Sequence, residues 1–165
     1  MQNSSHKLQE TSMTAEPKLI TKPAFTVVGL LLHTHPMSPE IPALWDQFVP
    51  RIREIQHQTE GHVSYGLMGR FDQATGMFDY MAGNPVTQVV QLPSGMTRWD
   101  LAANTYVVLE TTLSKIGETM DYAYRTWLPS SNYEGVDAPS FERYSEAFSP
   151  ENPVIDIYVP VKKKL

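Results

Sequence analysis

The stretch "PAFTVVGLLLHTH", residues 23–35, is rich in apolar and β-branched side chains and predicts a β-strand. A helix is expected next, because the apolar residues of "IPALWDQFVPRIREIQHQTE", residues 41–60, recur at steps of three and four. Pro50 lies inside this run and lacks a backbone donor, so we expect the helix to kink or end there. Two further strands are expected at 62–72 and 76–86, joined by a turn.

The second half of the chain repeats this order of elements, by pattern rather than by identity. A strand is predicted over 98–112, a helix over 113–131, and two more strands over 141–148 and 155–163. Two such strand–helix–strand–strand repeats predict an α+β domain with one antiparallel sheet. We expect both helices to cover one face of this sheet and a ligand cleft to lie on the other face.

Length and composition indicate a single soluble domain. We interpret residues 1–22 as a polar, loosely structured leader and residues 23–163 as the folded domain of this chain of 165 residues. The leader lacks the apolar core of a signal peptide, and the longest apolar run, Val27 to Leu32, is far shorter than the ~20 residues that a membrane helix needs. We therefore expect a cytoplasmic protein.

Charge and residue types exclude several classes of function. The net charge of −5 argues against broad binding to nucleic-acid phosphates, which requires clustered Lys and Arg. The chain has no cysteine, so disulfides, thiolate catalysis and zinc–thiolate sites are excluded. No glycine-rich phosphate loop is present, and we expect no cofactor and no metal.

Alternation along the last two predicted strands gives a candidate site. Ile155, Ile157 and Val159 are expected to face the helices, together with Phe141 of the preceding strand. The opposite, uncovered face would then carry two carboxyl groups and two tyrosines, namely Glu142, Tyr144, Asp156 and Tyr158. A glutamate in that position is either a satisfied residue of an edge strand or part of a pocket.

The side chains of such a pocket would suit a flat or bulky organic cation. Each aromatic ring attracts a cation by ~0.5–2 kcal/mol, and a carboxylate shielded from water gains more from a cation than an exposed one does. Further rings and a flexible methionine could join Glu142 from other strands and from the helices, although core packing explains them equally well. The candidate ligand-binding residues are Glu142, Tyr158, Tyr144, Tyr80, Tyr106, Trp45, Phe48, Tyr65, Met68 and Trp127.

Several segments together resemble a known family. The series "PAFTVVGLLLH", "LWDQF", "YGLMGRFD", "FDYMAG", "YVVLETT", "WLPSSNY", "PSFERY" and "IDIYVPV" is similar to the GyrI-like effector-binding domain. That domain is the drug-sensing part of many bacterial AraC- and MerR-type transcription regulators. The resemblance covers Pro23 to Lys162 and implies the duplicated fold with a ligand cleft between its halves.

The resemblance also implies roles for particular residues. Multidrug-sensing members receive the cationic group of a ligand on an acidic residue among aromatic rings. Glu142 in "FERY" matches the acidic position, and Tyr158 in "DIYVP" matches a ring position. Residues 1–22 are too short and polar for a helix-turn-helix segment, so we expect a stand-alone effector-binding protein or one that acts with a separate DNA-binding partner.

Three functions follow in order of preference. The first is a non-enzymatic binding module for amphipathic aromatic cations, since no catalytic set accompanies Glu142. The second is a GyrI-like hydrolase of reactive electrophiles, in which Glu142 would act as the base and Tyr144 or Tyr158 would donate a proton. The third is a protein-binding inhibitor of the gyrase-inhibitor type.

Overall fold

The computed structural model describes residues 16–60 and 62–165, and it confirms the predicted α+β class. Residues 1–15 of the expected leader lie outside the described residues. The predicted leader boundary at residue 22 is wrong, because Lys18–Lys22 form strand β1 and pair with residues 104–108 of strand β6. Leu19 and Ile20 give this segment enough apolar character to join the edge of the sheet.

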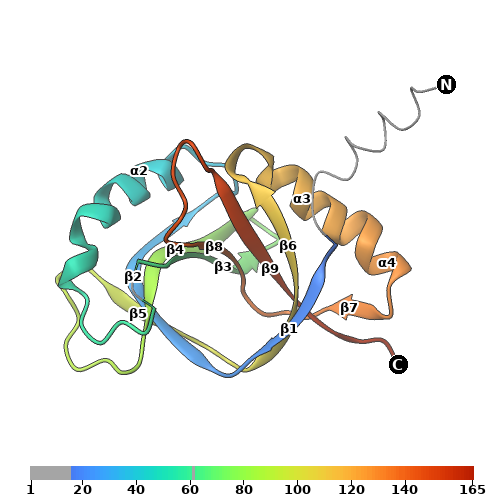
Figure 1. Cartoon of the computed structure of the whole chain (residues 1–165), viewed down its shortest axis with the longest axis horizontal. Coiled ribbons are helices and arrows are strands. Elements are labelled where there is room, and N and C mark those ends of the chain that lie inside the picture. The colour runs from blue at the N-terminus through green and yellow to red at the C-terminus, as the bar shows by residue number, and fades with distance from the viewer. Residues whose placement is uncertain (1–15, 61) are drawn as a thin grey trace.

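Within the described residues, nine strands form one antiparallel sheet, whose order is β1-β6-β9-β8-β3-β4-β2-β5, with β7 paired to β9. The strands are β1 (Lys18–Lys22), β2 (Phe25–Thr34), β3 (Ser64–Asp72), β4 (Met77–Val86), β5 (Thr97–Leu101), β6 (Asn104–Thr112), β7 (Tyr133–Gly135), β8 (Ser140–Tyr144) and β9 (Val154–Lys163). The helices are α2 (Glu40–Phe48), α3 (Ile116–Tyr122) and α4 (Leu128–Ser130). Both helical segments lie on the same face of the sheet, α2 toward one end and α3 with α4 toward the other (Figure 1).

Helix α2 forms where the sequence predicts it and ends near the predicted position. The hydroxyl of Ser38 accepts a hydrogen bond from the backbone N–H of Glu40 at 3.0 Å, which satisfies one free donor at the start of the helix. Leu44 and Phe48 are buried against strands β2 and β4. Pro50 follows, and the chain continues as a 3₁₀ helix over Val49–Glu54, as expected for a residue that cannot donate to the α-helical ladder.

The second helical segment is held on the sheet by a buried polar contact. The hydroxyl of Thr119 in α3 donates to the hydroxyl of Thr111 in β6 at 2.7 Å. Apolar residues of β6 and β9, including Leu109 and Ile157, pack beneath this helix. A π-helical turn over Ala123–Trp127 links α3 to α4, so the predicted helix at 113–131 is one helical segment with irregular geometry.

Two strand predictions need correction, and one short strand was missed. The expected strand at 98–112 is divided at Ala102 and Ala103 into β5, which pairs with β2, and β6, which pairs with β1 and β9. The expected strand at 141–148 ends at Tyr144, because the chain turns away there. Strand β7 was not predicted, since three residues are too short to give a periodic signal.

The face opposite the helices is filled by aromatic side chains and is not an open cleft. Phe141 of β8 stacks on Tyr158 of β9 with centroids 4.5 Å apart, and on Tyr65 of β3 at 5.1 Å. Tyr106 of β6 packs edge-on to Phe141 at 5.2 Å, and Phe25 of β2 does so at 5.8 Å. Since β2 and β6 are far apart in the strand order, these contacts mean that the sheet curls around its own core. The prediction of a cleft on this face is therefore wrong.

Close approach of two strands restricts one position of the sheet to glycine. Gly29 of β2 lies directly opposite Gly83 of β4. A methyl group at Gly29 would meet the carbonyl oxygen of Ala82 and the Cα of Gly83, which are backbone atoms that cannot turn aside. The close approach of β2 and β4 at this position thus depends on the missing side chain.

We expect Gly29→Ala to lower the free energy of unfolding by about 1–3 kcal/mol, the usual effect of forcing a methyl group into a filled space. Urea denaturation followed by circular dichroism measures this change. The matched control is Gly117→Ala, because Gly117 lies in α3 with nothing within 4 Å of an added methyl group. That control should be as stable as the parent or more stable, by up to about 1 kcal/mol. Equal stability of both variants would contradict the proposed role of Gly29.

Candidate functional site

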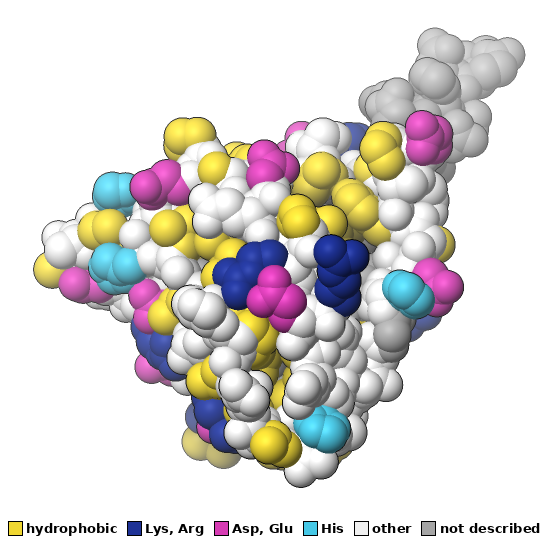
Figure 2. Space-filling model, turned by 90° about the vertical axis from the view of Figure 1, so that its left-hand side faces the viewer, with side chains coloured by type: hydrophobic (Ala, Val, Ile, Leu, Met, Phe, Trp, Pro, Cys, Tyr) yellow, Lys and Arg dark blue, Asp and Glu magenta, His cyan; other side chains and the backbone are white. Residues whose placement is uncertain are grey.

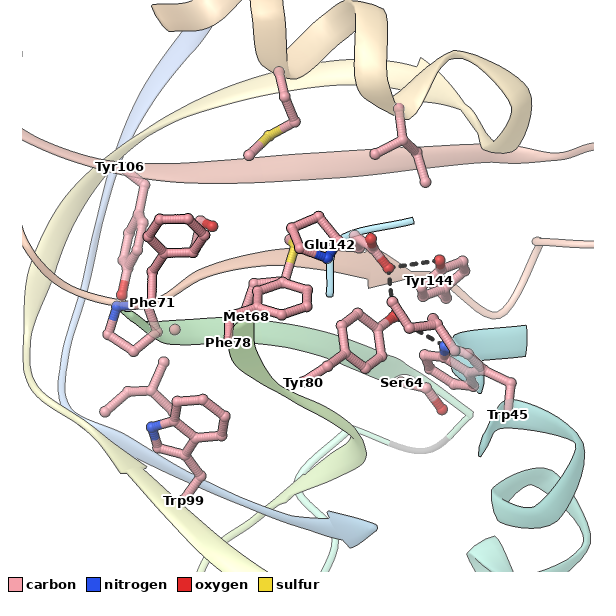
Figure 3. Close-up of a pocket in the computed structure, with 18 of the residues that line it drawn as sticks. Trp45, Ser64, Met68, Phe71, Phe78, Tyr80, Trp99, Tyr106, Glu142 and Tyr144 are labelled. Carbon is pink, nitrogen blue, oxygen red and sulfur yellow. Dashed lines mark hydrogen bonds between the residues drawn. The ribbon is translucent and has the colours of Figure 1, made fainter. Parts of the chain in front are cut away.

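A large cavity lies on the helix-bearing face, between α2 and α3. Its volume is about 1560 Å³. Strands β3, β4 and β8 and the helices α2 and α3 contribute to its lining, which extends to β5, β6 and the loop at 136–139. The lining includes Ile41, Ile116 and Met120 of the helices. It also includes Trp45, Met68, Phe78, Tyr80, Glu142 and Tyr144, which are labelled in Figure 3.

Glu142 lies at the centre of the sheet that lines this cavity. It is in the middle of β8, opposite Gly66 of β3 and Ile157 of β9, so its side chain projects from the helix-bearing face. Only 6% of its surface is exposed. Strand geometry therefore holds a carboxyl group inside a cavity whose walls are largely apolar.

Two tyrosines hold the carboxyl group of Glu142. The hydroxyl of Tyr80 donates to Glu142 Oε1 at 2.8 Å, and that of Tyr144 donates to the same oxygen at 2.7 Å. The indole Nε1 of Trp45 in turn donates to the hydroxyl of Tyr80 at 2.9 Å. The dashed lines in Figure 3 follow this network from α2 through β4 to β8. It fixes Glu142 and the rings around it in one arrangement.

Burial dominates the electrostatics of Glu142. Removal from water raises the pKa of its carboxyl group, and the hydrogen bonds from Tyr144 and Tyr80 offset part of this rise. Burial and the neighbouring carboxylate also raise the pKa of both tyrosines, so their hydroxyls stay protonated and act as donors. Among the ion pairs of residues 16–60 and 62–165, none includes Glu142.

A glycine makes room for this network. A methyl group at Gly66 would meet the hydroxyl of Tyr80 and would lie 2.6 Å from Glu142 Oε1. The contact between Tyr80 and Glu142 thus requires a residue without a side chain on the strand between them.

The charged residues of the cavity lining are mostly acidic. In addition to Glu142, the lining includes Asp46, Asp100, Asp137 and Glu146, whereas its one Arg or Lys among the described residues is Arg70. The guanidinium of Arg70 pairs with Asp79 at 3.1 Å and lies over the ring of Trp99. Carboxyl groups therefore outnumber basic side chains in the described lining of the cavity.

Six of the candidate residues named from the sequence line this cavity: Glu142, Tyr144, Tyr80, Tyr106, Trp45 and Met68. Trp45 and Tyr144 approach each other closely, with ring centroids 5.0 Å apart. Tyr106 contributes to the opposite end of the cavity, near Trp99, and its ring also packs on Phe141.

The other four candidates lie elsewhere. Tyr158 and Tyr65 belong to the aromatic core on the opposite face, where both stack on Phe141. Phe48, the last residue of α2, is completely buried in the core. Trp127, in the π-helical turn between α3 and α4, stacks on Tyr133. None of these four is among the residues that line the cavity.

The misplacement of Tyr158 has a definite physical cause. In the observed register Phe141 pairs with Tyr158, Glu142 with Ile157 and Arg143 with Asp156, and paired residues share a face. Glu142 therefore lies on the same face as Ile157, under the helices, whereas Asp156 and Tyr158 lie on the other face. The predicted grouping of Glu142 with Asp156 and Tyr158 is wrong, because alternation within one strand does not determine the register between two strands.

Residues of the second helical segment also line the cavity and were not among the candidates named from the sequence. They are Ile116 and Met120 of α3 and Tyr124 of the π-helical turn that follows it. Phe148, from the loop after β8, packs edge-on to Tyr144 at 5.0 Å. The helical spacing of Ile116, Met120 and Tyr124 was a usable signal, since it shows that they share one face of the helix.

The fold and the cavity together define a small-molecule-binding domain. Residues 15–162 match the family described as the GyrI-like small molecule binding domain, and the chain belongs to this family. The resemblance noted from the sequence is thereby confirmed.

Relatives of known sequence and structure agree with this assignment. The chain is 31% identical over 149 residues to the transcriptional regulator BrlR of Pseudomonas aeruginosa, covering 87% of this chain and 54% of BrlR. The chain thus spans about half the length of that relative. The fold is also that of SAV2435 bound to tetraphenylphosphonium (TM-score 0.70, 19% identity, 90% of this chain and 94% of the other) and of the EcmrR C-terminal domain (TM-score 0.67, 15% identity, 92% and 99%).

The surface shows mixed charge on the side of α2 and β5. Figure 2 views this side and shows basic, acidic and hydrophobic side chains interspersed, with no single field of Lys and Arg on that face. Within the part of the chain that the structure describes, no helix is long and apolar enough to cross a membrane.

The raised pKa of Glu142 predicts a gain in stability when its charge is removed. The pKa of this carboxyl group is higher in the folded than in the unfolded state, so the folded state favours the protonated form. The resulting contribution to stability is complete below the unfolded-state pKa and is lost as pH rises through the folded-state pKa, because the buried group then becomes charged. We therefore expect Glu142→Gln to raise the melting temperature at pH 8, and the difference from the parent to shrink as pH falls toward 4.5, the ordinary value for glutamate. Scanning calorimetry across this range measures it. A variant less stable than the parent at pH 8 would contradict the assigned cost of burial.

Proposed function

We propose that this domain binds amphipathic aromatic cations and that Glu142 receives their positive charge. The observation that carries the proposal is the position of Glu142. Its carboxyl group is almost completely buried among aromatic rings, and it forms no ion pair with any Lys or Arg of the described chain. Such a group is costly to ionise unless a positive charge is placed beside it.

A bound cation would offset this cost in two ways. It would interact with the carboxylate in a region largely shielded from water, where charges attract more strongly than at the surface. The rings of Trp45 and Tyr144 would add cation–π attraction, about 0.5–2 kcal/mol for each ring. Apolar side chains such as Met68, Phe78 and Met120 would contact the hydrocarbon part of the ligand.

The relatives support the class of ligand and the context of binding. SAV2435 was solved with tetraphenylphosphonium, a bulky aromatic cation, and BrlR is named as a transcriptional regulator. By analogy, we propose that ligand binding here informs a regulator, either through further segments of the same protein or through a separate DNA-binding partner. We place this binding in the cytoplasm, where such regulators act.

A binding role fits the network better than catalysis does. As a general base in a hydrolase, Glu142 would need a carboxylate that readily takes a proton from water. The reaction would also need a nearby acid, yet the hydroxyls of Tyr80 and Tyr144 are held on Oε1 of Glu142 with raised pKa values, and Tyr158 lies on the other face of the sheet. No tyrosine is therefore placed to donate a proton to a substrate, and we propose that the domain is not an enzyme.

Charge should decide which ligands bind. Tetraphenylphosphonium and tetraphenylborate have nearly the same shape and opposite charge, and triphenylphosphine oxide is a neutral analogue. We expect isothermal titration calorimetry to detect micromolar binding of the phosphonium alone. Glu142→Gln should weaken this binding about tenfold or more, equivalent to roughly 1.4 kcal/mol, because it removes the charge and keeps the shape.

The matched control is Glu60→Gln. Glu60 also accepts a hydrogen bond from a tyrosine, Tyr65, pairs with Arg143, and is not among the residues that line the cavity. This variant should bind tetraphenylphosphonium as the parent does. Equal binding of the cation and the anion, or equal losses in both variants, would refute the role proposed for Glu142.

A further inference from the structure

We propose that the cavity selects, among aromatic cations of one shape, those that carry an N–H group, and that Glu142 Oε2 is the atom that recognises it. This inference rests on the proposed function and makes the ligand class more specific: protonated amines and amidines rather than permanently charged quaternary ions. It follows from how the protons of the tyrosine network are distributed over the two oxygens of Glu142.

The direction of each hydrogen bond in the network is fixed by donor capacity. An indole N–H can only donate, so the hydroxyl of Tyr80 accepts from Trp45 Nε1. The single proton of Tyr80 is then directed to Glu142 Oε1, where the proton of Tyr144 is also directed. Both hydroxyl protons are therefore used on one oxygen of the carboxyl group.

The second oxygen is left for the ligand. Oε2 accepts no hydrogen bond from the protein within residues 16–60 and 62–165, whereas Oε1 accepts two. No buried side-chain oxygen or nitrogen in this part of the chain lacks a partner, which means that Oε2 is not sealed inside the protein. Since Glu142 lines the cavity, Oε2 is the oxygen that a ligand in the cavity can reach.

A carboxylate oxygen that is open to the cavity changes the relative affinities of protonated amines and quaternary ions. A protonated amine is more strongly hydrated than a quaternary ion and loses more on entering an apolar cavity. It recovers this loss only where a charged acceptor is available, because an N–H···O hydrogen bond to a carboxylate is short and about twice as strong as a neutral one. The methyl or phenyl groups of a quaternary ion keep its charge away from Oε2, so that it gains attraction at longer range only.

Glu142 differs from the other carboxyl groups of the cavity in its burial. Asp46, Asp100, Asp137 and Glu146 also line the cavity, but their side chains are exposed to solvent, whereas Glu142 is buried. The lining also includes the apolar residues Met68, Phe78, Ile116 and Met120. The hydroxyl oxygen of Tyr80 already accepts a hydrogen bond from Trp45, and that of Tyr144 is a neutral acceptor, which is weaker than a carboxylate. An N–H group placed near the rings of Trp45 and Tyr144 is therefore directed to Oε2.

The test compares two ligands that differ by one methyl group: dimethyl(naphthylmethyl)amine, which is protonated at neutral pH, and trimethyl(naphthylmethyl)ammonium. We expect calorimetry to show that the protonated amine binds the unmodified chain about tenfold more tightly, the factor expected for one net charge-assisted hydrogen bond. In Glu142→Gln this preference should disappear, because both tyrosines will donate to the amide oxygen and leave the amide NH₂, which cannot accept, toward the cavity.

Tyr65→Phe serves as the control variant and should keep the tenfold preference, since its hydroxyl bonds to Glu60 on the other face of the sheet. Equal affinities of the two naphthyl compounds, or tighter binding of the quaternary one, would overturn this inference. The proposed function would still stand if tetraphenylphosphonium binds. If the protonated amine fails to bind while tetraphenylphosphonium binds, the inference fails alone. If no cation binds, both the inference and the proposed function fail.

Discussion

The burial of one carboxyl group is the constraint on which the site depends. Glu142 is held almost out of water on the central strand of a curved sheet, and the protein supplies hydroxyl donors but no ion pair for it within the described chain. Removing this carboxyl group from water costs free energy, and the apolar packing on both faces of the sheet offsets that cost. In the proposed function the same cost would favour a bound positive charge, since a cation would stabilise the ionised group that the protein alone stabilises only in part.

Several features far apart in the sequence exist to maintain this arrangement. Gly66 leaves space for the contact between Tyr80 and Glu142, and Trp45 connects helix α2 to that contact. On the other face, the stacked rings of Phe141 and Tyr158 fix the register of β8 against β9, which decides the face from which Glu142 projects. The aromatic core thus determines the position of the site without taking part in it.

The sequence predicted the main elements because each carries a clear periodic signal. Strands β2, β3, β4 and β9, the end of α2 near Pro50 and the α+β class were all recognisable from apolar spacing. Glu142, Tyr144, Tyr80 and Trp45 were also named, and the structure brings them together. What failed was every inference that required the register between strands: Tyr158 and Asp156 were grouped with Glu142, and the cleft was assigned to the wrong face. Register is a tertiary property, decided here by rings that only the curled sheet brings into contact.

The central claim is that Glu142 has a raised pKa that a bound cation lowers. An NMR titration of the carboxyl carbon of Glu142, assigned with the Glu142→Gln variant, measures this pKa directly with and without tetraphenylphosphonium. The account predicts an inflection above 4.5, the ordinary glutamate value, in the free protein, and a shift to lower pH when the cation is present. An inflection at the ordinary value that does not move on addition of the cation would contradict it.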